Sequence, residues 1–363
     1  MIYEVKDRKR LKQFIYYVKE LYGNNELYVY PIFKTLFKEL KQEILISNRY
    51  TGLLAYRDKK IVGRILFTYE FNNKKNMNVC YFSFFDQIND AKVTEELFAY
   101  IFNDMKKNNV TYIEGTFSPY DPDTRRGVLV EGFNQSPTLF CSYNYEYYND
   151  LLCKMGFIKA LDTVELNVDL NKFVYSKLIR LGNLVKNRYD VRVDNMNYRN
   201  LEKDINDVHE ILQSATTEIN YQEAPSIELI RSVAKSMKLF INPELIKIAR
   251  ENKTNKPIGF CLILPDFNEV IKKTKGRFRP IKYLLLRKKI ERVKGTLQYI
   301  IPEYQNTGLL GIIYLSVYET MQKYHINYFS AGTIVEYNHK SIDALLHFGA
   351  EISKRYRLYG KEI

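Results

Sequence analysis

One pattern of segments occurs twice along this chain of 363 residues. A charged turn followed by an aliphatic run with an early glycine reads RDKKIVGRILF from Arg57 and ENKTNKPIGFCLI from Glu251. A strand-like run precedes each copy, so each reads as a β-hairpin, and helix-like and strand-like segments then alternate in the same order. This repetition predicts two domains of one fold, and the length suits two domains of about 170–180 residues.

The periodicity of apolar residues predicts the elements of each half. The predicted strands are 50–56, 61–69, 78–85, 110–113, 160–168, 191–196, 245–250, 257–264, 296–301, 328–333 and 351–359. The predicted helices are 6–22, 31–41, 95–107, 144–155, 201–215, 227–238, 308–324 and 338–347. A basic helical stretch separates the halves, so we expect an N-terminal domain over 1–170, a linker helix over 171–190 and a C-terminal domain over 191–363.

Composition places the chain among folded proteins of a reducing compartment. Apolar residues make up 46% and charged residues 27%, which excludes a disordered chain. No run approaches the roughly 18 apolar residues of a membrane span, and the charged start has no signal-peptide core. The four cysteines form no C-x-x-C pair and the four histidines show no metal-ligand spacing. We therefore expect a cytoplasmic protein without a metal site.

The formal net charge of +13 is concentrated in one segment. Residues 271–294 contain eleven Lys or Arg and one Glu. Such a segment could contact nucleic acid or an anionic membrane, or lie beside a cofactor that carries several phosphates. It could equally be a solvated loop and helix, and the sequence leaves these interpretations open.

The stretch from Ile300 to Gly311, IIPEYQNTGLLG, joins a predicted strand to a predicted helix. A glycine-bearing turn at the start of a helix leaves backbone N–H groups free at the positive end of the helix dipole. That arrangement binds phosphate groups. The sequence therefore predicts a diphosphate-containing cofactor held by the backbone of residues 306–310.

The order of elements and this turn resemble the GNAT superfamily of acyl-CoA-dependent N-acyltransferases. The phosphate turn of that family is Arg/Gln-x-x-Gly-x-Gly/Ala, and Gln305 and Gly308 match its first two defined positions. Leu310 occupies the second small position, and Gly311 lies one residue late. The resemblance implies that coenzyme A contacts the following residues: Ile300, Ile301, Gln305, Asn306, Thr307, Gly308, Leu309, Leu310 and Asn338.

Further segments resemble a group of tandem-GNAT bacterial proteins. They are YNYEYYNDLLCKMGF at 143–157, PDFN at 265–268, TIVEYN at 333–338 and FGAEISKRYRLYGKEI at 348–363. This likeness implies two tandem GNAT-like domains of the α/β class, each a mixed, mostly antiparallel twisted sheet flanked by helices. It also implies transfer of an acetyl or longer acyl group from coenzyme A to an amine of a small molecule or peptide.

The first half lacks the phosphate turn. At the corresponding place it has FDQIND, residues 85–90, with no glycine and with Asp86 and Asp90 near the start of a helix. Asp90 is a good N-cap, and two carboxylates would repel a diphosphate. We therefore expect one cofactor site, in the second half.

Acyl transfer to an amine needs a polarised thioester carbonyl and a base for the amine proton. The resemblance implies a bulged strand that leaves a free N–H near Ile300 and Ile301. Glu336 is the first candidate for the base, with Tyr337 beside it; the alternative is that Glu336 only pairs with a lysine. Leu345 stands where the family often has a tyrosine acid, which puts a tyrosine-acid mechanism in doubt.

Four residues are candidates for binding the acceptor. Asp266 and Asn268 follow a strand, and Tyr143 and Asn144 fall near the junction of the halves; turn formation and ring packing are the alternatives. Two other functions stay open. One is a non-catalytic module that docks on nucleic acid or an anionic membrane through residues 271–294, and the other is transfer from aminoacyl-tRNA.

Overall fold

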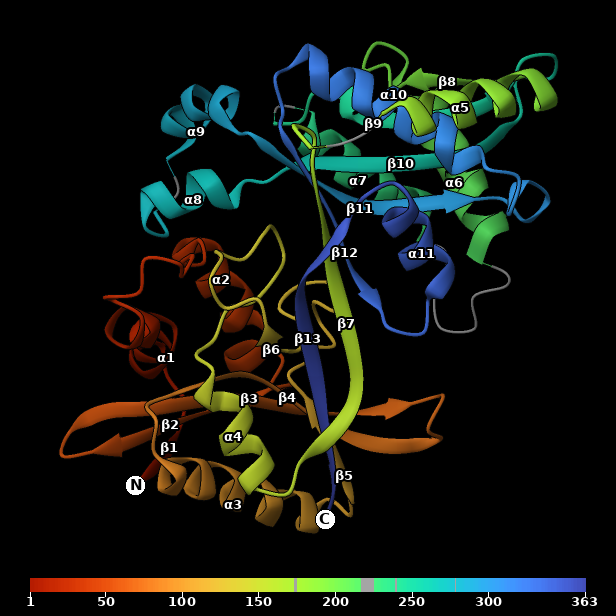
Figure 1. Cartoon of the computed structure of the whole chain (residues 1–363). Helices are drawn as coiled ribbons and strands as arrows, with labels where there is room; N and C mark the ends of the chain where they lie inside the picture. The colour runs from red at the N-terminus through yellow and green to blue at the C-terminus, as the bar shows by residue number, and fades with distance from the viewer. Residues whose placement is uncertain (173–174, 217–224, 239, 278) are drawn as a thin grey trace.

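The computed structural model describes residues 1–172, 175–216, 225–238, 240–277 and 279–363. Its strands join into one 13-stranded sheet (Figure 1). The order is β1-β2-β3-β4-β5-β13-β7-β12-β11-β10-β9-β8, and β6 pairs with β13 off this path. The strands are β1 (Ile2–Glu4), β2 (Thr51–Arg57), β3 (Lys60–Asn72), β4 (Met77–Gln87), β5 (Tyr112–Gly115), β6 (Val128–Glu131), β7 (Ile158–Asp169), β8 (Val191–Asn195), β9 (Ile246–Glu251), β10 (Pro257–Pro265), β11 (Arg292–Ile300), β12 (Tyr328–Val335) and β13 (Glu351–Glu362).

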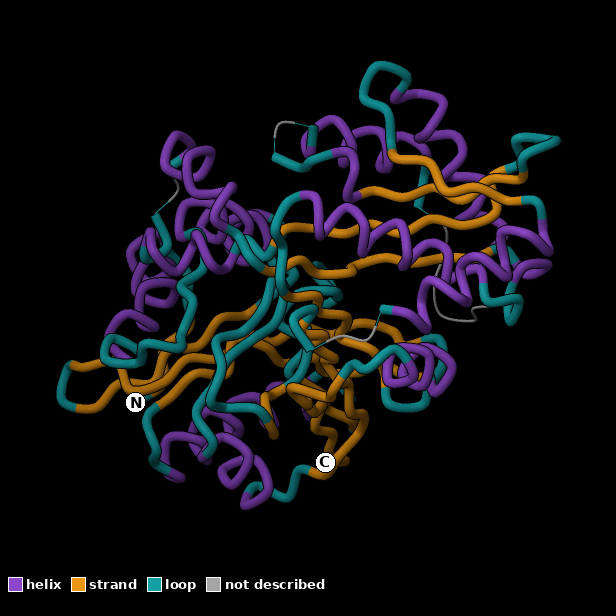
Figure 2. The backbone as a smooth tube through the Cα atoms, turned by 45° about the horizontal axis from the view of Figure 1, so that its top comes forward, coloured by secondary structure: helices purple, strands orange, loops and turns teal. Residues whose placement is uncertain are grey.

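Helices flank the strands of each half (Figure 2). They are α1 (Arg8–Leu21), α2 (Phe33–Leu40), α3 (Ala91–Lys107), α4 (Tyr147–Lys154), α5 (Ser176–Tyr189), α6 (Leu201–Thr216), α7 (Ile227–Met237), α8 (Asn268–Thr274), α9 (Pro280–Leu286), α10 (Leu309–Lys323) and α11 (His339–His347). Two predicted segments include residues outside the described ranges: 173–174 in the linker and 278 in the basic segment. In the described part of the chain, no helix combines the length and the apolar character needed to cross a membrane.

The two halves repeat one arrangement of strands. Antiparallel hairpins lead in each half to a single parallel pair, β4 with β5 and β11 with β12. β4 and β5 are paired only over 79–82 and 112–115, and β11 and β12 only over 292–295 and 328–331. The predicted fold class is confirmed: the protein is α/β, with a mixed, mostly antiparallel sheet flanked by helices.

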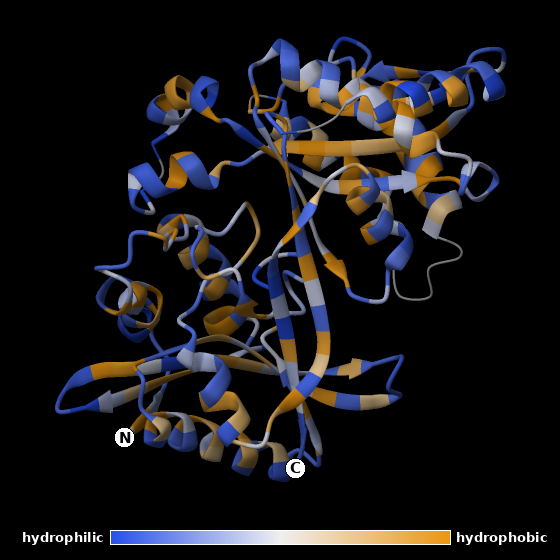
Figure 3. Cartoon of the chain, viewed as in Figure 1, coloured by the Kyte–Doolittle hydropathy of each residue, from blue (hydrophilic) through white to orange (hydrophobic). Residues whose placement is uncertain are grey.

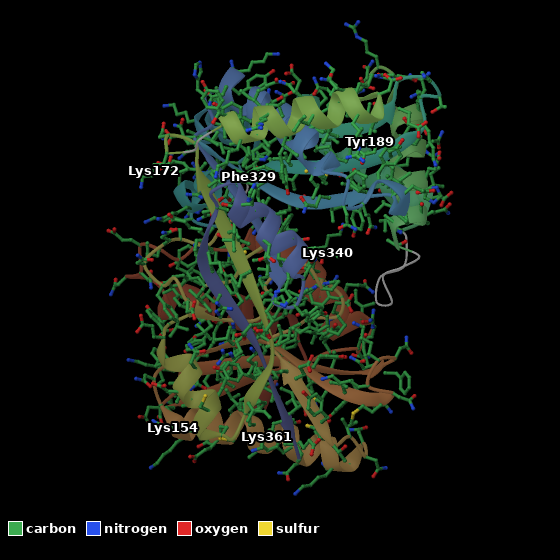
Figure 4. The ribbon with its side chains drawn as sticks, turned by 45° about the vertical axis from the view of Figure 1, so that its right-hand side comes forward. Lys154, Lys172, Tyr189, Phe329, Lys340 and Lys361 are labelled. Carbon is green, nitrogen blue, oxygen red and sulfur yellow. The ribbon has the colours of Figure 1, made fainter. Side chains whose placement is uncertain are left out.

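The two long strands β7 and β13 connect the halves. β7 pairs with β12 as well as with β13, and the end of β13 pairs with β5, where Tyr359 lies opposite Gly115. In the side view of Figure 4, Lys361 near the end of β13 lies in the first half, whereas Phe329 of β12 lies in the second. The last strand of the chain therefore completes the sheet of the first half. The domain limits 1–170 and 191–363 remain a prediction from the sequence.

Three strands differ from the predicted pattern. β1 and β6 are too short, at three and four residues, to show a clear alternation. β11 begins at Arg292, earlier than the predicted start at residue 296. The sequence pattern does not indicate this start, because the fully buried Val293 lies between two basic residues. One of these, Lys294, is itself only 1% exposed, since it meets Glu165 of β7 inside the protein.

Candidate active site

The parallel strands β11 and β12 separate part-way along their length in the second half. They pair only up to Gly295, although β11 continues to Ile300 and β12 to Val335. Beyond the paired part β12 stays beside β7, where Ile334 lies opposite Val164. We call the region between the separated ends of β11 and β12 the wedge.

A bulge on β11 lies where the wedge begins. Leu297 lies opposite Leu262 of β10, and the next pair along the strands is Gly295 with Ile263. Thr296 is therefore an extra residue on β11. An extra residue of this kind interrupts the ladder and leaves backbone groups unpaired at that point.

The free N–H predicted near Ile300 and Ile301 is not that of Ile301. Ile301 donates its N–H to the carbonyl of Ile258 at 3.0 Å and is 2% exposed, because the antiparallel pairing with β10 reaches this residue. Successive amides of a strand point to opposite sides. The N–H groups of Gln298 and Ile300 therefore point away from β10, toward the wedge.

The turn after β11 exposes backbone amides at the start of α10. The chain passes through two left-handed residues, Asn306 with φ of 60° and Gly308 with φ of 85°, and Gly308 is the N-cap of the 15-residue helix. Gly308 has no side chain to cap the helix. Among the described residues, no hydrogen-bond acceptor meets the amides of Asn306, Thr307, Gly308 and Leu310. These amides lie at the positive end of the α10 dipole and can hold an anion.

Both glycines of the turn also fit the packing of α5 against α10. A Cβ atom at Gly308 would lie 3.1 Å from Val185, and one at Gly311 would lie 2.6 Å from Leu181. The displaced Gly311 is therefore explained by close helix packing. The side chain of Gln305 reaches back to the Ile300 carbonyl at 3.4 Å.

On the other side of the wedge, α11 follows β12. Asn338 is its N-cap, and its Oδ1 accepts the Ser341 amide at 3.2 Å. Leu345 is 3% exposed and belongs to the same apolar cluster as Ile301 and Leu309. The residue at the position of the family's usual acid is thus a core residue, and α11 contributes apolar side chains to the second half.

Glu336 holds β12 and β7 together. Its carboxylate lies 2.6 Å from Lys159 Nζ and accepts the Asp162 amide at 3.1 Å. Partial burial acts to raise the pKa of Glu336, but the bonds from Lys159 and Asp162 outweigh it and hold the pKa below its usual value. This ion pair is the alternative role considered for Glu336, namely pairing with a lysine. Tyr337 is 54% exposed. Catalytic roles for both residues stay predictions.

Comparison with solved structures identifies this arrangement. A tandem GNAT protein from the clavulanic acid biosynthesis pathway matches all of this chain and 98% of its own, with a TM-score of 0.55 and 10% identity. A GCN5-related N-acetyltransferase from Sphaerobacter thermophilus matches 99% of this chain and 95% of its own, with a TM-score of 0.54 and 9% identity. The chain has a tandem GNAT fold.

Other relatives agree with the tandem GNAT fold. A GCN5-related glucosamine N-acetyltransferase region in a fungal multi-domain beta-N-acetylglucosaminidase matches 99% of the chain with a TM-score of 0.59 and 10% identity, and the match spans 38% of that fungal chain. Protein YghO of Escherichia coli is 24% identical over 376 residues, covering 98% of this chain and 94% of YghO. No family model matches the chain. The predicted resemblance is confirmed for the fold.

In this tandem GNAT fold, Asp266 and Asn268 bind a loop of the first half. Asp266 is 3% exposed, and its Oδ1 accepts the amides of Leu139 at 3.0 Å and Asn268 at 3.1 Å. The Asn268 side chain donates to the Pro137 carbonyl at 2.9 Å. Burial raises the pKa of Asp266 to about 6, although Lys294 opposes the shift. The contacts seen at these residues are thus contacts between the halves.

The raised pKa of Asp266 has a measurable consequence. Between the unfolded value of about 3.9 and about 6, folded protein keeps a proton that unfolded protein has lost, so wild-type stability falls as pH rises through this window. Asn keeps the acceptor oxygen but does not titrate. We therefore expect the free energy of unfolding of Asp266→Asn, taken relative to that of wild type, to increase by roughly 1–3 kcal/mol as pH rises from about 4 to about 7. Urea denaturation at several pH values measures this difference. A difference that does not change with pH would contradict this.

The other two residues predicted to bind the acyl acceptor line a cavity of about 630 Å³ in the first half. Tyr143 and Asn144 lie in its wall with Asn268 of α8. Asn144 also has a structural role, because its side chain bonds both backbone groups of Leu129, at 2.7 and 3.2 Å. Among the described residues, no group of three His, Cys, Asp or Glu side chains could hold a metal ion.

One charged residue of the cavity, Glu39, carries no signal in the sequence. Glu39 of α2 lines the cavity, and burial raises its pKa. Among the described residues it has no ion-pair or hydrogen-bond partner. Arg125 lies over the Phe84 ring at 4.7 Å and also lines the cavity. Helical spacing alone places Glu39 on an exposed helix face, and only the tertiary fold brings it beside the loop of Arg125.

At the place of the missing phosphate turn, the structure differs from the prediction at one of the two aspartates. Asp90 caps α3 and accepts the Lys92 amide at 2.9 Å, which confirms the predicted N-cap. Asp86 instead points into the protein, where Arg64 bonds it at 2.8 and 2.5 Å. Its charge is neutralised, so only Asp90 can repel an anion at the start of α3. The absence of a cofactor site in this half stays a prediction.

Proposed function

We propose that the protein is an acyl-CoA-dependent N-acyltransferase whose cofactor binds at the turn before α10. The observation that carries this proposal is the set of unpartnered amides at Asn306, Thr307, Gly308 and Leu310. Each contact between an anion and a helix N-terminus contributes about 0.3–1 kcal/mol, so several amides must act together on a diphosphate. The same turn follows β11, which is one side of the wedge.

The residues of the wedge fit the needs of acyl transfer. Bound acyl-CoA would supply the activated acyl thioester, and coenzyme A would be its leaving group. The amides of Gln298 and Ile300 point toward the wedge, where backbone N–H groups can stabilise charge on an acyl oxygen. Glu336 and Tyr337, which follow β12, are the candidates for taking the amine proton. The contacts of the Glu336 carboxylate are with Lys159 and the Asp162 amide of β7, and Lys159 keeps Glu336 ionised, as a base must be. The acceptor is an amine of a small molecule or peptide.

The names of the relatives support the same reaction class. The fungal region is called a glucosamine N-acetyltransferase and the Sphaerobacter protein an N-acetyltransferase, and both share this fold. Calorimetry with acetyl-CoA, a longer acyl-CoA and free coenzyme A tests the proposal. We expect all three to bind with dissociation constants below about 1 mM, in the usual range of enzyme substrates. The proposal is ruled out if none of the three compounds produces a heat of binding.

The variant Asn306→Asp tests the position of the site. Asn306 is exposed and left-handed, a conformation that Asp tolerates, and the new carboxylate lies beside the unpartnered amides. Repulsion of about 1–1.5 kcal/mol predicts coenzyme A binding weaker by roughly 5- to 15-fold. Asn109→Asp is the matched control, because Asn109 is also exposed and left-handed but lies after α3. Equal affinities of the two variants would place the cofactor elsewhere.

A further inference from the structure

The α8–α9 segment, residues 268–277 and 279–289, presents aliphatic side chains to solvent. On α9, Ile281 is 76% exposed, Leu285 71% and Leu284 42%. Their spacing of three and four residues puts them on one face of the helix. Figure 3 shows that α8 and α9 each carry both hydrophobic and hydrophilic positions and lie at the edge of the molecule. Exposed aliphatic side chains gathered in this way indicate an interaction site.

The orientation of α9 is fixed by its opposite face. The ring of Tyr283 packs against Phe267 at 5.0 Å and Phe240 at 5.9 Å, and burial raises its pKa. With Tyr283 held against the protein, Ile281 and Leu285 face outward. The exposed face is thus a feature of the packed structure.

Positive charge surrounds this apolar face. Lys282, Lys288 and Lys289 are exposed and form no ion pair with a described carboxylate. The exposed cations of the segment are Lys272, Lys273, Lys275, Arg277, Arg279, Lys282, Arg287, Lys288 and Lys289. Lys294, in contrast, is buried and does not contribute to the surface.

We propose that the α8–α9 segment docks the protein on the surface of an anionic membrane. Lys and Arg near a membrane attract acidic lipid headgroups, and aliphatic side chains on the same helix enter the boundary between headgroups and acyl chains. Nucleic acid would use the cations but would leave Ile281 and Leu285 without apolar partners, so the combination favours a lipid surface. In the described ranges no helix can span a membrane, and docking requires none.

The docking segment also touches the cavity of the first half. Asn268 and Ile271 of α8 line that cavity, and Gly276 accepts the Phe33 amide next to it at 3.1 Å. Membrane docking would therefore bring one wall of the cavity close to the lipid surface. This inference does not depend on the proposed acyl transfer, because it concerns a different surface.

Flotation with lipid vesicles tests the proposal without any acyl-CoA. We expect the 363-residue protein to bind vesicles of phosphatidylcholine mixed with phosphatidylglycerol. It should bind far less to pure phosphatidylcholine vesicles, and far less to the mixed vesicles at high salt. The double variant Ile281→Ser, Leu285→Ser should bind the mixed vesicles about tenfold or more weakly. The triple variant Lys282→Glu, Lys288→Glu, Lys289→Glu should lose the preference for phosphatidylglycerol.

The control is the double variant Ile158→Ser, Leu184→Ser, which removes aliphatic side chains of 71% and 60% exposure elsewhere. It should float like wild type, and an unfolding curve of each variant tests whether that variant is folded. The proposal is overturned if wild type does not bind mixed vesicles at low salt. It is equally overturned if the Ile281 and Leu285 variant binds them like wild type, or if a DNA duplex competes fully with the vesicles.

Discussion

Replacing Glu165 by Gln should lower the free energy of unfolding by about 3–5 kcal/mol, the usual cost of breaking a buried ion pair. Glu165 is fully buried and lies 3.5 Å from Lys294 and 3.8 Å from Lys354, each 1% exposed. The Gln side chain keeps the size but leaves two ammonium groups inside the protein without their carboxylate. Because β7, β11 and β13 contribute the three residues, urea denaturation should show the loss as one cooperative shift.

The pH dependence of this effect follows from the pKa of Glu165. Burial acts to raise that pKa, but Lys294 and Lys354 outweigh burial and hold it below its ordinary value. The stabilisation is therefore complete above the unfolded value of about 4.3 and is lost as pH falls through the lower folded value. The gap between wild type and Glu165→Gln should narrow in acid.

The matched control is Glu131→Gln, which breaks an exposed pair with Arg355. The Glu131 side chain is 61% exposed, so we expect less than about 1 kcal/mol. If Glu165→Gln cost no more than this control, the buried cluster would not stabilise the joint between the halves.

Arg64→Met should have a similar effect in the first half. The Arg64 side chain is 3% exposed, bonds Asp86 twice and donates to the Phe14 carbonyl at 2.6 Å. Met fills much of the volume but leaves the Asp86 charge without its partner, at a cost of about 3–5 kcal/mol. Tyr22 donates to the same carboxylate at 3.0 Å, which only partly compensates.

A second variant separates charge from packing. Arg64→Met with Asp86→Asn removes the unpaired charge and keeps an acceptor for Tyr22, so it should recover much of the lost stability. Arg49→Met is the exposed control, since its side chain is 53% exposed and pairs with Glu70. A double variant less stable than the single one would show that packing, and not the ion pair, explains the loss.

Local patterns in the sequence are sufficient to predict most of the helices and strands. The hairpins β2–β3 and β9–β10 can be predicted from the apolar residues on both sides of their charged turns. The cap at Asp90 follows from its side-chain oxygen just before an amphipathic run. These features depend on neighbours within a few residues, and such neighbours can be read from a single sequence.

Long-range pairing could not be read in this way. Nothing in the alternation of β13 distinguishes β5, at its far end, from β7 as a partner, although it pairs with both. Likewise the sequence pattern indicates a shifted phosphate-turn glycine at Gly311, whereas in the structure Leu181 of α5 packs on it. Residues far apart in the sequence determine both contacts.

Charged residues were the least predictable part of the site. Lys294 falls in a run of basic residues that suggests a solvated segment, yet Glu165 lies beside it in the interior. Asp266 looked like a ligand for a substrate and instead binds the backbone of the first half. The role of a charged residue depends on the group that the fold places beside it, and that group cannot be identified from the sequence pattern.

We expect coenzyme A to bind at the turn before α10, and a crystal structure of the complex with coenzyme A is the decisive measurement. We expect the diphosphate oxygens to lie within about 3.2 Å of the amides of Thr307 and Gly308. A diphosphate at the start of α3 beside Asp90, or at any place away from residues 306–310, would show that the cofactor site lies elsewhere.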